Sequence, residues 1–365
     1  MAPYLSKDQT QISRRAILTP PINSHSHYGQ QIPNAVGYWL ISCCLMVAIM
    51  IALGGATRLT ESGLSIVNWQ PVTGILPPLN DKEWAALFTA YMQTPEFTKI
   101  NFWMTISDFK SIYWLEYLHR LWGRLIGIVF LLPYVYFLLR GVLPRALIWR
   151  FGCLFLLGGI QGLLGWYMVR SGLVDEPSVS QYRLAGHLSL AFVIFGLLFW
   201  YSISCLTSRP PKSGFGWAQA GSFTILCCVG VTSVWGAFVA GLDAGRAYNT
   251  FPLMDGRLVP RDLLLSSPWW INFFENSAGV QFTHRVFAVG TVTLIFLFWL
   301  LAHRTPLPKA VRRATNLLAL IALFQLGLGI ATLLSGVAMA LGIFHQMGAL
   351  ALITAAIWVH YQIGD

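Results

Sequence analysis

Charged residues are scarce in this chain of 365 residues: Asp, Glu, Lys and Arg make up 10% of it, against about 25% in a typical soluble domain. Apolar residues make up 56%, and the mean hydropathy is +0.60. This composition excludes a disordered protein, a nucleic-acid-binding domain and an ordinary cytosolic enzyme. It predicts an all-α, polytopic membrane protein, in which the net charge of +10 is distributed along the chain rather than gathered in one patch.

Cysteine is also scarce, and its spacing does not form a metal-binding pattern. No two of the six cysteines form a CxxC motif, and all lie in or beside apolar runs, so we expect buried thiols rather than disulfides or a zinc site. A cleavable secretory signal is not expected either, because residues 1–35 form a polar tail without a short apolar run and cleavage site. Asp8 and the low arginine content of this tail disfavour a mitochondrial presequence.

Long apolar runs are abundant, and each is close to the 20 or so residues that cross a bilayer. In the third run, Gly158, Gly162 and Gly165 have a spacing that would permit close helix approach. The eight predicted spans are Val36–Ala56, Tyr117–Leu139, Ile148–Met168, Leu184–Leu206, Trp217–Gly241, Phe282–Ala302, Ala314–Ser335 and Leu341–Tyr361.

The loops between these spans predict an orientation. With the N-terminus inside, the short inside segments and span edges carry 12 Lys and Arg but only two acids, Asp8 and Asp365. Short loops rich in Lys and Arg stay on the cytoplasmic side, so both termini are predicted to lie inside. The two long connections, 57–116 and 242–281, are then outside. The first contains an amphipathic stretch, Trp84–Phe97, that fits either a helix lying on the membrane surface or a helix capping the loop.

The chain also repeats itself once, with four spans in each half. An even number of spans gives both halves the same orientation, which predicts two pseudo-symmetric four-helix bundles in a parallel repeat. The predicted parts are a polar tail (1–35), a first half (36–206), an inside linker (207–216) and a second half (217–365). The matching segments are Glu116–Arg120 with Gln281–Arg285, Gly159–Gly172 with Phe324–Gly336, Ala185–Leu188 with Ile343–Gln346, and Thr60–Gly63 with Leu242–Gly245.

Four of the eight histidines open the even-numbered spans, two in each half: His119, His187, His284 and His345. A polar residue within a membrane span is costly and usually functional, although a single histidine could simply bond across helices. Two imidazoles on separate helices among apolar and aromatic walls are typical of bis-histidine haem ligation. The other four, in the tail, in an inside loop and near the C-terminus, are expected to be solvated or interfacial: His25, His27, His303 and His360.

Charged residues beside these histidines differ between the halves. Glu116 precedes His119 by three residues and shares its helix face, whereas the matching residue is the amide Gln281. This asymmetry favours chemistry in the first half and a permanent cofactor in the second, or else a simple pairing of Glu116 with Arg120. The arginines near the histidines fit haem propionates or lipid headgroups: Arg120, Arg124 and Arg285.

At these residues the chain resembles the haem A synthase family, in its proteobacterial and mitochondrial form, from about Tyr38 to Tyr361. The resemblance rests on the four histidines and on three motifs: Gly54-Gly-Ala-Thr-Arg-Leu-Thr-Glu-Ser-Gly-Leu-Ser, Asn68-Trp-Gln-Pro-Val-Thr-Gly, and Glu116-Tyr-Leu-His-Arg-Leu-Trp-Gly-Arg. Some bacterial relatives carry two cysteines in the first outer loop, and loop 57–116 here contains none. A thiol-based role in that loop is therefore excluded for this chain.

The resemblance implies an oxidoreductase that converts the C8 methyl of haem O to a formyl group in two steps, giving haem A for cytochrome oxidase. It implies that His119 and His187 hold the substrate haem, that His284 and His345 ligate haem b, and that Glu116 acts near the methyl. A haem O synthase and cytochrome oxidase assembly factors are expected partners, and a homo-oligomer is compatible. The expected location is a bacterial cytoplasmic membrane, and a mitochondrial inner membrane also fits.

Two other functions fit parts of the sequence. A cytochrome b-type quinol or ferric reductase would also carry two bis-histidine sites, but would stack its haems on both sides of the bilayer. A transporter built from a parallel repeat would show broken helices and charges near the midplane. The placement of all four histidines near one face favours the enzyme.

Overall fold

The computed structural model describes residues 32–69, 74–173, 180–208, 210 and 214–364, and the described residues are mainly α-helical. Eight of the helices are long and apolar enough to cross a membrane, which agrees with the number predicted. Their ends lie within a few residues of the predicted ends, except for the start of α3. These helices are α1 (Asn34–Leu59), α3 (Ile106–Leu139), α4 (Arg145–Gly172), α5 (Gln181–Leu206), α6 (Gly216–Gly241), α8 (Ser277–Arg304), α9 (Lys309–Leu334) and α10 (Met339–Ile363).

Helix α3 begins 11 residues before the predicted span. A capping box starts it: the Thr105 side chain accepts from the Asp108 amide, and the Asp108 carboxylate accepts from the Thr105 amide. Its 34 residues extend for roughly 50 Å, well beyond a hydrocarbon core of about 30 Å. The first turns of α3 therefore project beyond the bilayer and support the first long connection.

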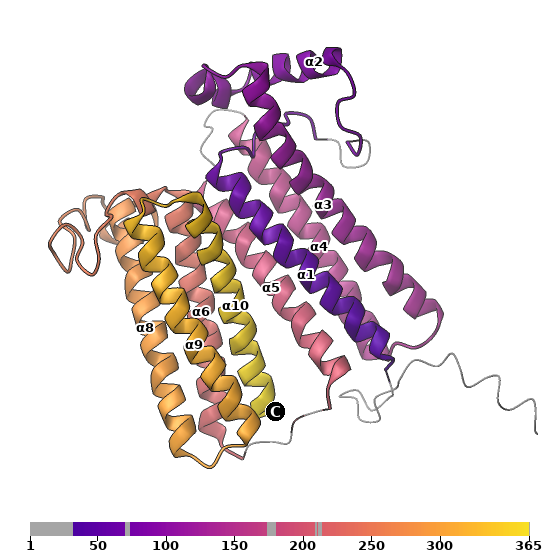
Figure 1. Ribbon diagram of the computed structural model, residues 1–365, viewed down its shortest axis with the longest axis vertical. Helices are drawn as coiled ribbons and strands as arrows, with labels where there is room; N and C mark the ends of the chain where they lie inside the picture. The colour runs from indigo at the N-terminus through magenta and orange to yellow at the C-terminus, as the bar shows by residue number, and fades with distance from the viewer. Residues whose placement is uncertain (1–31, 70–73, 174–179, 209, 211–213, 365) are drawn as a thin grey trace, which may run out of the picture.

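That connection folds onto the projecting end of α3 (Figure 1). Helix α2 (Asp81–Tyr91) and the short π-helical turn η1 (Phe97–Asn101) form it. Trp84 packs on Tyr113 with ring centres 5.0 Å apart, and Tyr91 stacks on Phe109 at 5.1 Å. Trp84 and Tyr91 of α2 are thus buried against α3. These contacts favour the capping helix, one of the two alternatives that the sequence left open.

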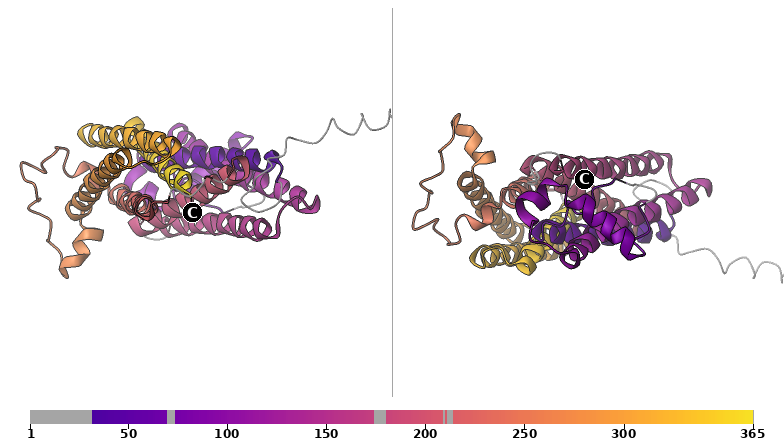
Figure 2. Two further views of the ribbon diagram at one scale, coloured as in Figure 1. Left: turned by 90° about the horizontal axis from the view of Figure 1, so that it is seen from below. Right: turned by 90° about the horizontal axis from the view of Figure 1, so that it is seen from above.

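The spanning helices form two groups that lie side by side (Figure 1 and Figure 2). One consists of α1, α3, α4 and α5, and the other of α6, α8, α9 and α10. Helices α5 and α6, together with α1 and α10, form the contact between the groups. The Gln346 side chain donates to the Ile51 carbonyl at 2.9 Å within this contact. At the end of the groups where α2 lies, Arg58 pairs with Asp243 at 2.9 Å.

The second long connection links α6 to α8 and projects sideways from its group (Figure 2). It contains the 3-10 turns η2 (Ala244–Arg246) and η3 (Trp269–Ile271) and the one-turn helix α7 (Asn272–Glu275). The buried Asn272 side chain organises it, because its amide donates to the carbonyls of Ser266 and Trp269. Both long connections thus lie at the same end of the bundle.

Candidate functional site

The four histidines lie near the end of the bundle that carries the two long connections, which we call the histidine end. His187, His284 and His345 each stand about two turns after the start of their helices, and His119 lies below the projecting part of α3. All four side chains are partly buried. The structure therefore brings the predicted ligands to a common depth, in one pair per group.

A glycine on the preceding spanning helix faces each of these rings. A Cβ atom built on the glycine would lie only 2.9–3.2 Å from the histidine Cε1 in every case. Real side chains do not tolerate contacts at the short end of this range without movement. The four glycines therefore allow the imidazoles to lie directly against the neighbouring helix backbone. The pairs are Gly54 with His119, Gly165 with His187, Gly236 with His284, and Gly329 with His345.

In the second group, the rings of His284 and His345 are separated by 6.5 Å between centres and are nearly perpendicular, at 88°. Two metal–nitrogen bonds of about 2 Å, with about 1 Å from each nitrogen to its ring centre, give roughly 6 Å for an ion bound between two imidazoles. His284 Nδ1 lies 3.2 Å from the Thr232 carbonyl, which leaves Nε2 for a metal. The pair therefore fits an iron with two axial histidines.

His119 and His187 form the corresponding pair of the first group. The Gln161 amide donates to the His187 carbonyl at 3.0 Å, and it also lies 3.4 Å from His187 Nε2. Gln325 makes the same bond to the His345 carbonyl at 2.9 Å. Nδ1 of His119 and of His187 is buried without a hydrogen-bond partner among the described residues. Gln161 therefore contacts both the backbone and the ring of His187.

Glu116 is buried one turn above His119 and fastens the first connection to α3. Its Oε1 accepts from the Arg120 guanidinium at 2.6 Å, while Oε2 accepts from the Ser65 hydroxyl at 2.7 Å and the Ile66 amide at 2.8 Å. Arg120 also donates to the Ile66 carbonyl at 2.9 Å. The predicted pair of Glu116 and Arg120 therefore exists, and it holds the loop directly above the first histidine pair.

Gln281 and Arg285 fasten the second connection in a similar way. The Gln281 amide donates to the carbonyls of Ala244 and Tyr248 at 2.9 and 3.2 Å. Arg285 donates to the carbonyls of Tyr248 and Thr250 at 2.9 and 2.8 Å. A neutral amide is thus sufficient to hold a loop at this position. Holding the loop does not by itself explain why the first group has a carboxylate.

The remaining predicted positions lie in different surroundings. Arg124 stands one turn below Arg120 on α3. His303 is exposed and lies beside Trp299 with ring centres 4.9 Å apart, whereas His360 bonds to Ser222 across α6 and α10 at 2.9 Å. His360 is therefore an interhelical residue rather than a solvated one. His25, His27 and positions 70–73 of the second motif lie outside the described residues.

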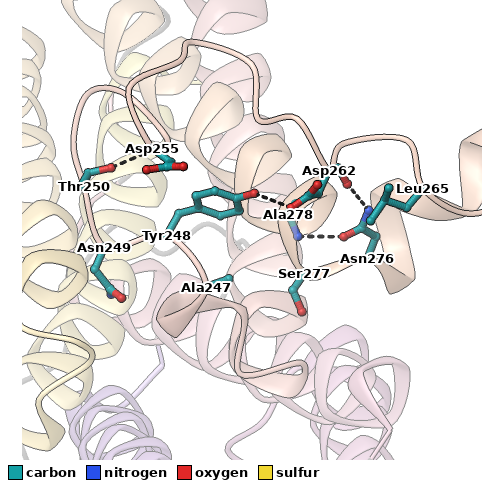
Figure 3. A pocket seen from close by; sticks show the side chains of 10 residues that line it. All are labelled: Ala247, Tyr248, Asn249, Thr250, Asp255, Asp262, Leu265, Asn276, Ser277 and Ala278. Atoms are coloured by element: carbon teal, nitrogen blue, oxygen red, sulfur yellow. Dashed lines mark hydrogen bonds between the residues drawn. The ribbon is translucent and has the colours of Figure 1, made fainter.

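A pocket of about 460 Å³ lies in the second connection, beside the Tyr248–Asp262 hydrogen bond (Figure 3). None of the four histidines lines it. Among the described residues, no group of three or more His, Cys, Asp or Glu could hold a bare metal ion. Iron held in a macrocycle needs only two axial ligands, so the histidine pairs remain the candidate site.

Sequence reasoning missed the residues that support the histidines. One signal was available: the Gln161–Gly165 and Gln325–Gly329 spacings match within the repeated segments. Gly54 likewise belongs to the first motif but had no assigned role. The proposed close packing through Gly158 and Gly162 is wrong, because a Cβ on either meets no atom within 4 Å, whereas Gly165 contacts the His187 ring.

The fold and the site define a polytopic helical membrane protein with two histidine pairs near one end of its bundle. The chain belongs to the cytochrome oxidase assembly protein family, whose profile matches residues 37–357. It is 45% identical to the haem A synthase of Nitrosospira multiformis over 94% of this chain and 97% of that protein. It is 46% identical to that of Paramagnetospirillum magneticum over 90% and 94%. It is 45% identical to human haem A synthase COX15 over 90% and 83%.

Proposed function

We propose that this protein is a haem A synthase, an oxidoreductase that converts the C8 methyl of haem O to a formyl group for cytochrome oxidase. The observation that supports this most strongly is the difference between two similar histidine pairs. Each histidine ring packs against a glycine of the preceding spanning helix, but a buried carboxylate, Glu116, lies next to only the first pair. Membership of the family and the names of its relatives agree with this function.

In this proposal, His119 and His187 bind the iron of the substrate haem O, and His284 and His345 bind a resident haem b. The 6.5 Å separation of the second pair supports the latter assignment. Haem b, when bound, supplies one-electron chemistry between substrate and acceptor. Glycines place the four rings directly against the neighbouring helices, and Gln161 and Gln325 bond to the backbones of His187 and His345, so little reorientation is needed when a haem binds.

Glu116 has two roles in the proposal. Through Ser65, Ile66 and Arg120 it positions the first connection over the substrate edge. As the buried carboxylate nearest to His119 along α3, it also stabilises positive charge and accepts protons as C–H bonds are broken. Gln281 can perform only the first of these roles.

Arg120, Arg124 and Arg285 are proposed to face the haem propionates at the histidine end. Arg120 and Arg285 already bind loop carbonyls, so a propionate would share these guanidinium groups with the loops. A guanidinium carries five donors, which is enough for both partners. In this arrangement, haem binding and loop closure support each other.

The surroundings of the protein follow from charge and substrate. We expect both termini on the cytoplasmic side of a bacterial cytoplasmic membrane, because the Lys and Arg residues concentrate in the short loops opposite the histidine end. A hydrophobic substrate favours direct delivery by a haem O synthase and transfer of product to cytochrome oxidase assembly factors.

The test is haem extraction followed by reversed-phase separation from cells that make haem O, with and without this protein. New haem A, or its alcohol intermediate, is the expected result. Unchanged haem O, with haem b bound to correctly folded protein, would overturn the proposal. That result would favour a bis-histidine electron carrier, in which Glu116 only holds the first connection against α3.

A further inference from the structure

The outer part of the second connection, residues 250–271, projects sideways from the bundle, and we call it the arm. It extends beyond α8 in both views along the bundle (Figure 2). In Figure 1 the arm stays level with the upper ends of α6 and α8, whereas α2 lies well above these ends on the projecting part of α3. Because α6 and α8 cross the bilayer, a sideways projection at their ends lies at the depth of the lipid headgroups.

The polar groups of the arm and its base face inward. The fully buried Asn272 side chain donates to two backbone carbonyls of the arm, and the Asn276 side chain donates to the Asp262 carbonyl at 2.6 Å. Both acids of the arm, Asp255 and Asp262, line the pocket at its base (Figure 3). The interior of the arm is therefore polar, which is the reverse of a loop that folds around an apolar core in water.

The apolar side chains of the arm are exposed instead. Leu258 is 75% exposed and Trp269 is 65% exposed. An exposed apolar surface of this kind usually marks an interaction site. Tryptophan is enriched where membrane proteins pass through the lipid headgroups, because its ring is apolar and its N–H is polar. The exposed apolar residues of the arm include Leu258, Val259, Leu264, Leu265, Trp269 and Trp270.

The arginines and the neighbouring helix fit the same environment. Arg257 and Arg261 are exposed and do not line the pocket that holds both acids. Long arginine side chains can keep their apolar stems in lipid while the guanidinium reaches a phosphate. Helix α8, beside which the arm lies (Figure 1), exposes Val286, Val289 and Leu297 along its length. Lipid that covers α8 therefore also meets the arm, so a second protein is not needed to cover it.

We propose that the arm is an interfacial anchor that rests in the headgroup region of the bilayer. Leu258, Leu264 and Trp269 contact lipid acyl chains near the headgroups, and Arg257 and Arg261 contact lipid phosphates. The partner is the lipid surface itself, because the arm lies at its depth and carries the side chains that it favours. The inference does not depend on the proposed function.

Lipid contact completes the support of the second connection. From the protein side, Gln281 and Arg285 of α8 donate to carbonyls of the connection between Ala244 and Thr250. The arm extends outward from this base. With the base held by α8 and the arm held by the bilayer, the connection is fixed on both sides above His284.

Thiol labelling of cysteines introduced into the full-length protein tests the anchor. Leu258→Cys and Leu264→Cys are compared with Phe102→Cys in nanodiscs of phosphatidylcholine and phosphatidylglycerol that hold one copy each. The reagent is a charged maleimide that does not enter lipid. Phe102 is 70% exposed, against 75% for Leu258 and 55% for Leu264, and it lies just before the projecting end of α3. The six native cysteines lie in spanning helices, so the wild type gives the background.

We expect both arm cysteines to react at least about tenfold more slowly than Phe102→Cys, because the reactive thiolate is disfavoured outside water. Equal rates at the three positions would place the arm in water and overturn the anchor. Slow labelling that appears only with two copies in each disc would mean that a second copy covers the arm, and would overturn the anchor as well.

A nitroxide attached to Leu258→Cys distinguishes lipid from protein in the same discs. We expect its relaxation to respond to oxygen, which dissolves in lipid, and not to a water-soluble nickel chelate. Low accessibility to both would mean that protein covers the position, and the anchor would be wrong. Haem A formation is not measured in these experiments, so failure of the anchor and failure of the proposed function are distinguishable.

Discussion

A histidine inside an apolar span stands out in a sequence, but the glycine on which it rests does not. Gly54, Gly165, Gly236 and Gly329 acquire their role only where two helices meet, and helix facing cannot be read from one span. Hydropathy and the repeat were therefore sufficient to single out the four candidate ligands. They gave no prediction of which small residue orients each ring.

Gly329, which packs against the His345 ring, provides a test at the residue scale. In Gly329→Val, the Cβ would lie 2.9 Å from His345 Cε1, so the ring must move away from the pair with His284. We expect most haem b to be lost, measured as pyridine haemochrome per protein. Gly327→Val is the matched control, because a Cβ there meets no atom within 4 Å. Equal haem b content in the two variants would contradict a role of Gly329 in positioning the His345 ring.

Substitutions of the four histidines are expected to have different effects in the two helix groups. His284→Ala or His345→Ala should remove the firmly bound haem b, because each substitution removes one of its two proposed ligands. His119→Ala or His187→Ala should keep haem b and stop haem A formation. Haemochrome content and extracted haem A, measured on the same membranes, check both halves of this prediction. Unchanged haem b in the His284 and His345 variants would reverse the assignment.

Glu116 can be tested for chemistry beyond its loop contacts. We expect Glu116→Ala to leave haem b in place but reduce haem A formation by at least about 100-fold, the lower range for loss of a general acid–base group. Ser65→Ala removes one loop contact and keeps the carboxylate, so it should retain most activity. Similar losses of haem A formation in the two variants would mean that Glu116 acts only by holding the first connection in place.

At the scale of single elements, α3 shows where hydropathy misleads. The apolar pattern predicted a span from Tyr117, because Asp108 and Lys110 lower the hydropathy of the preceding turns. Those turns are helical because a capping box starts them and because Phe109 and Tyr113 pack on α2. Tertiary contacts from a distant segment decided this boundary, and such contacts are absent from a window of sequence.

The subdomain formed by α2 and η1 should loosen as pH rises. Burial raises the pKa of the Glu96 carboxyl to about 8; a hydrogen bond from Tyr91 opposes the rise, and Glu116 and Glu61 add to it. From its ordinary pKa near 4.5 up to about 8, the folded state holds a proton that the unfolded state releases. The free energy of unfolding therefore falls as pH rises through this window.

Hydrogen exchange of the α2 amides, corrected for intrinsic rates, measures this effect. We expect faster opening at pH 9 than at pH 6 in wild type, and little difference in Glu96→Gln, which stays neutral. Asp81→Asn is the control, because Asp81 is exposed at the start of the same helix. A pH dependence that persists in Glu96→Gln would exclude Glu96 as its source.

At the scale of the whole molecule, the sequence predicted eight spans and four matching segments but not how the halves meet. The contact uses α1 with α10 and α5 with α6, including the bond from Gln346 to Ile51. Neither Gln346 nor Ile51 has a charge or spacing that distinguishes it in the sequence. Facing surfaces between two apolar bundles depend on shape, and hydropathy carries no information about shape.

Orientation is the property of the whole molecule that the charge pattern predicts most directly. An alkaline phosphatase reporter, which needs an oxidising compartment to form its disulfides, should be active when inserted in the connection 242–281 and inactive between α8 and α9. Insertion at Gly141, in the turn between α3 and α4, should also be inactive. The α8–α9 link is flanked by Arg304 and Lys309, whose transfer across the bilayer is disfavoured. Activity in the α8–α9 link together with silence in 242–281 would invert the topology and place the histidine end, with both candidate haem sites, on the cytoplasmic side.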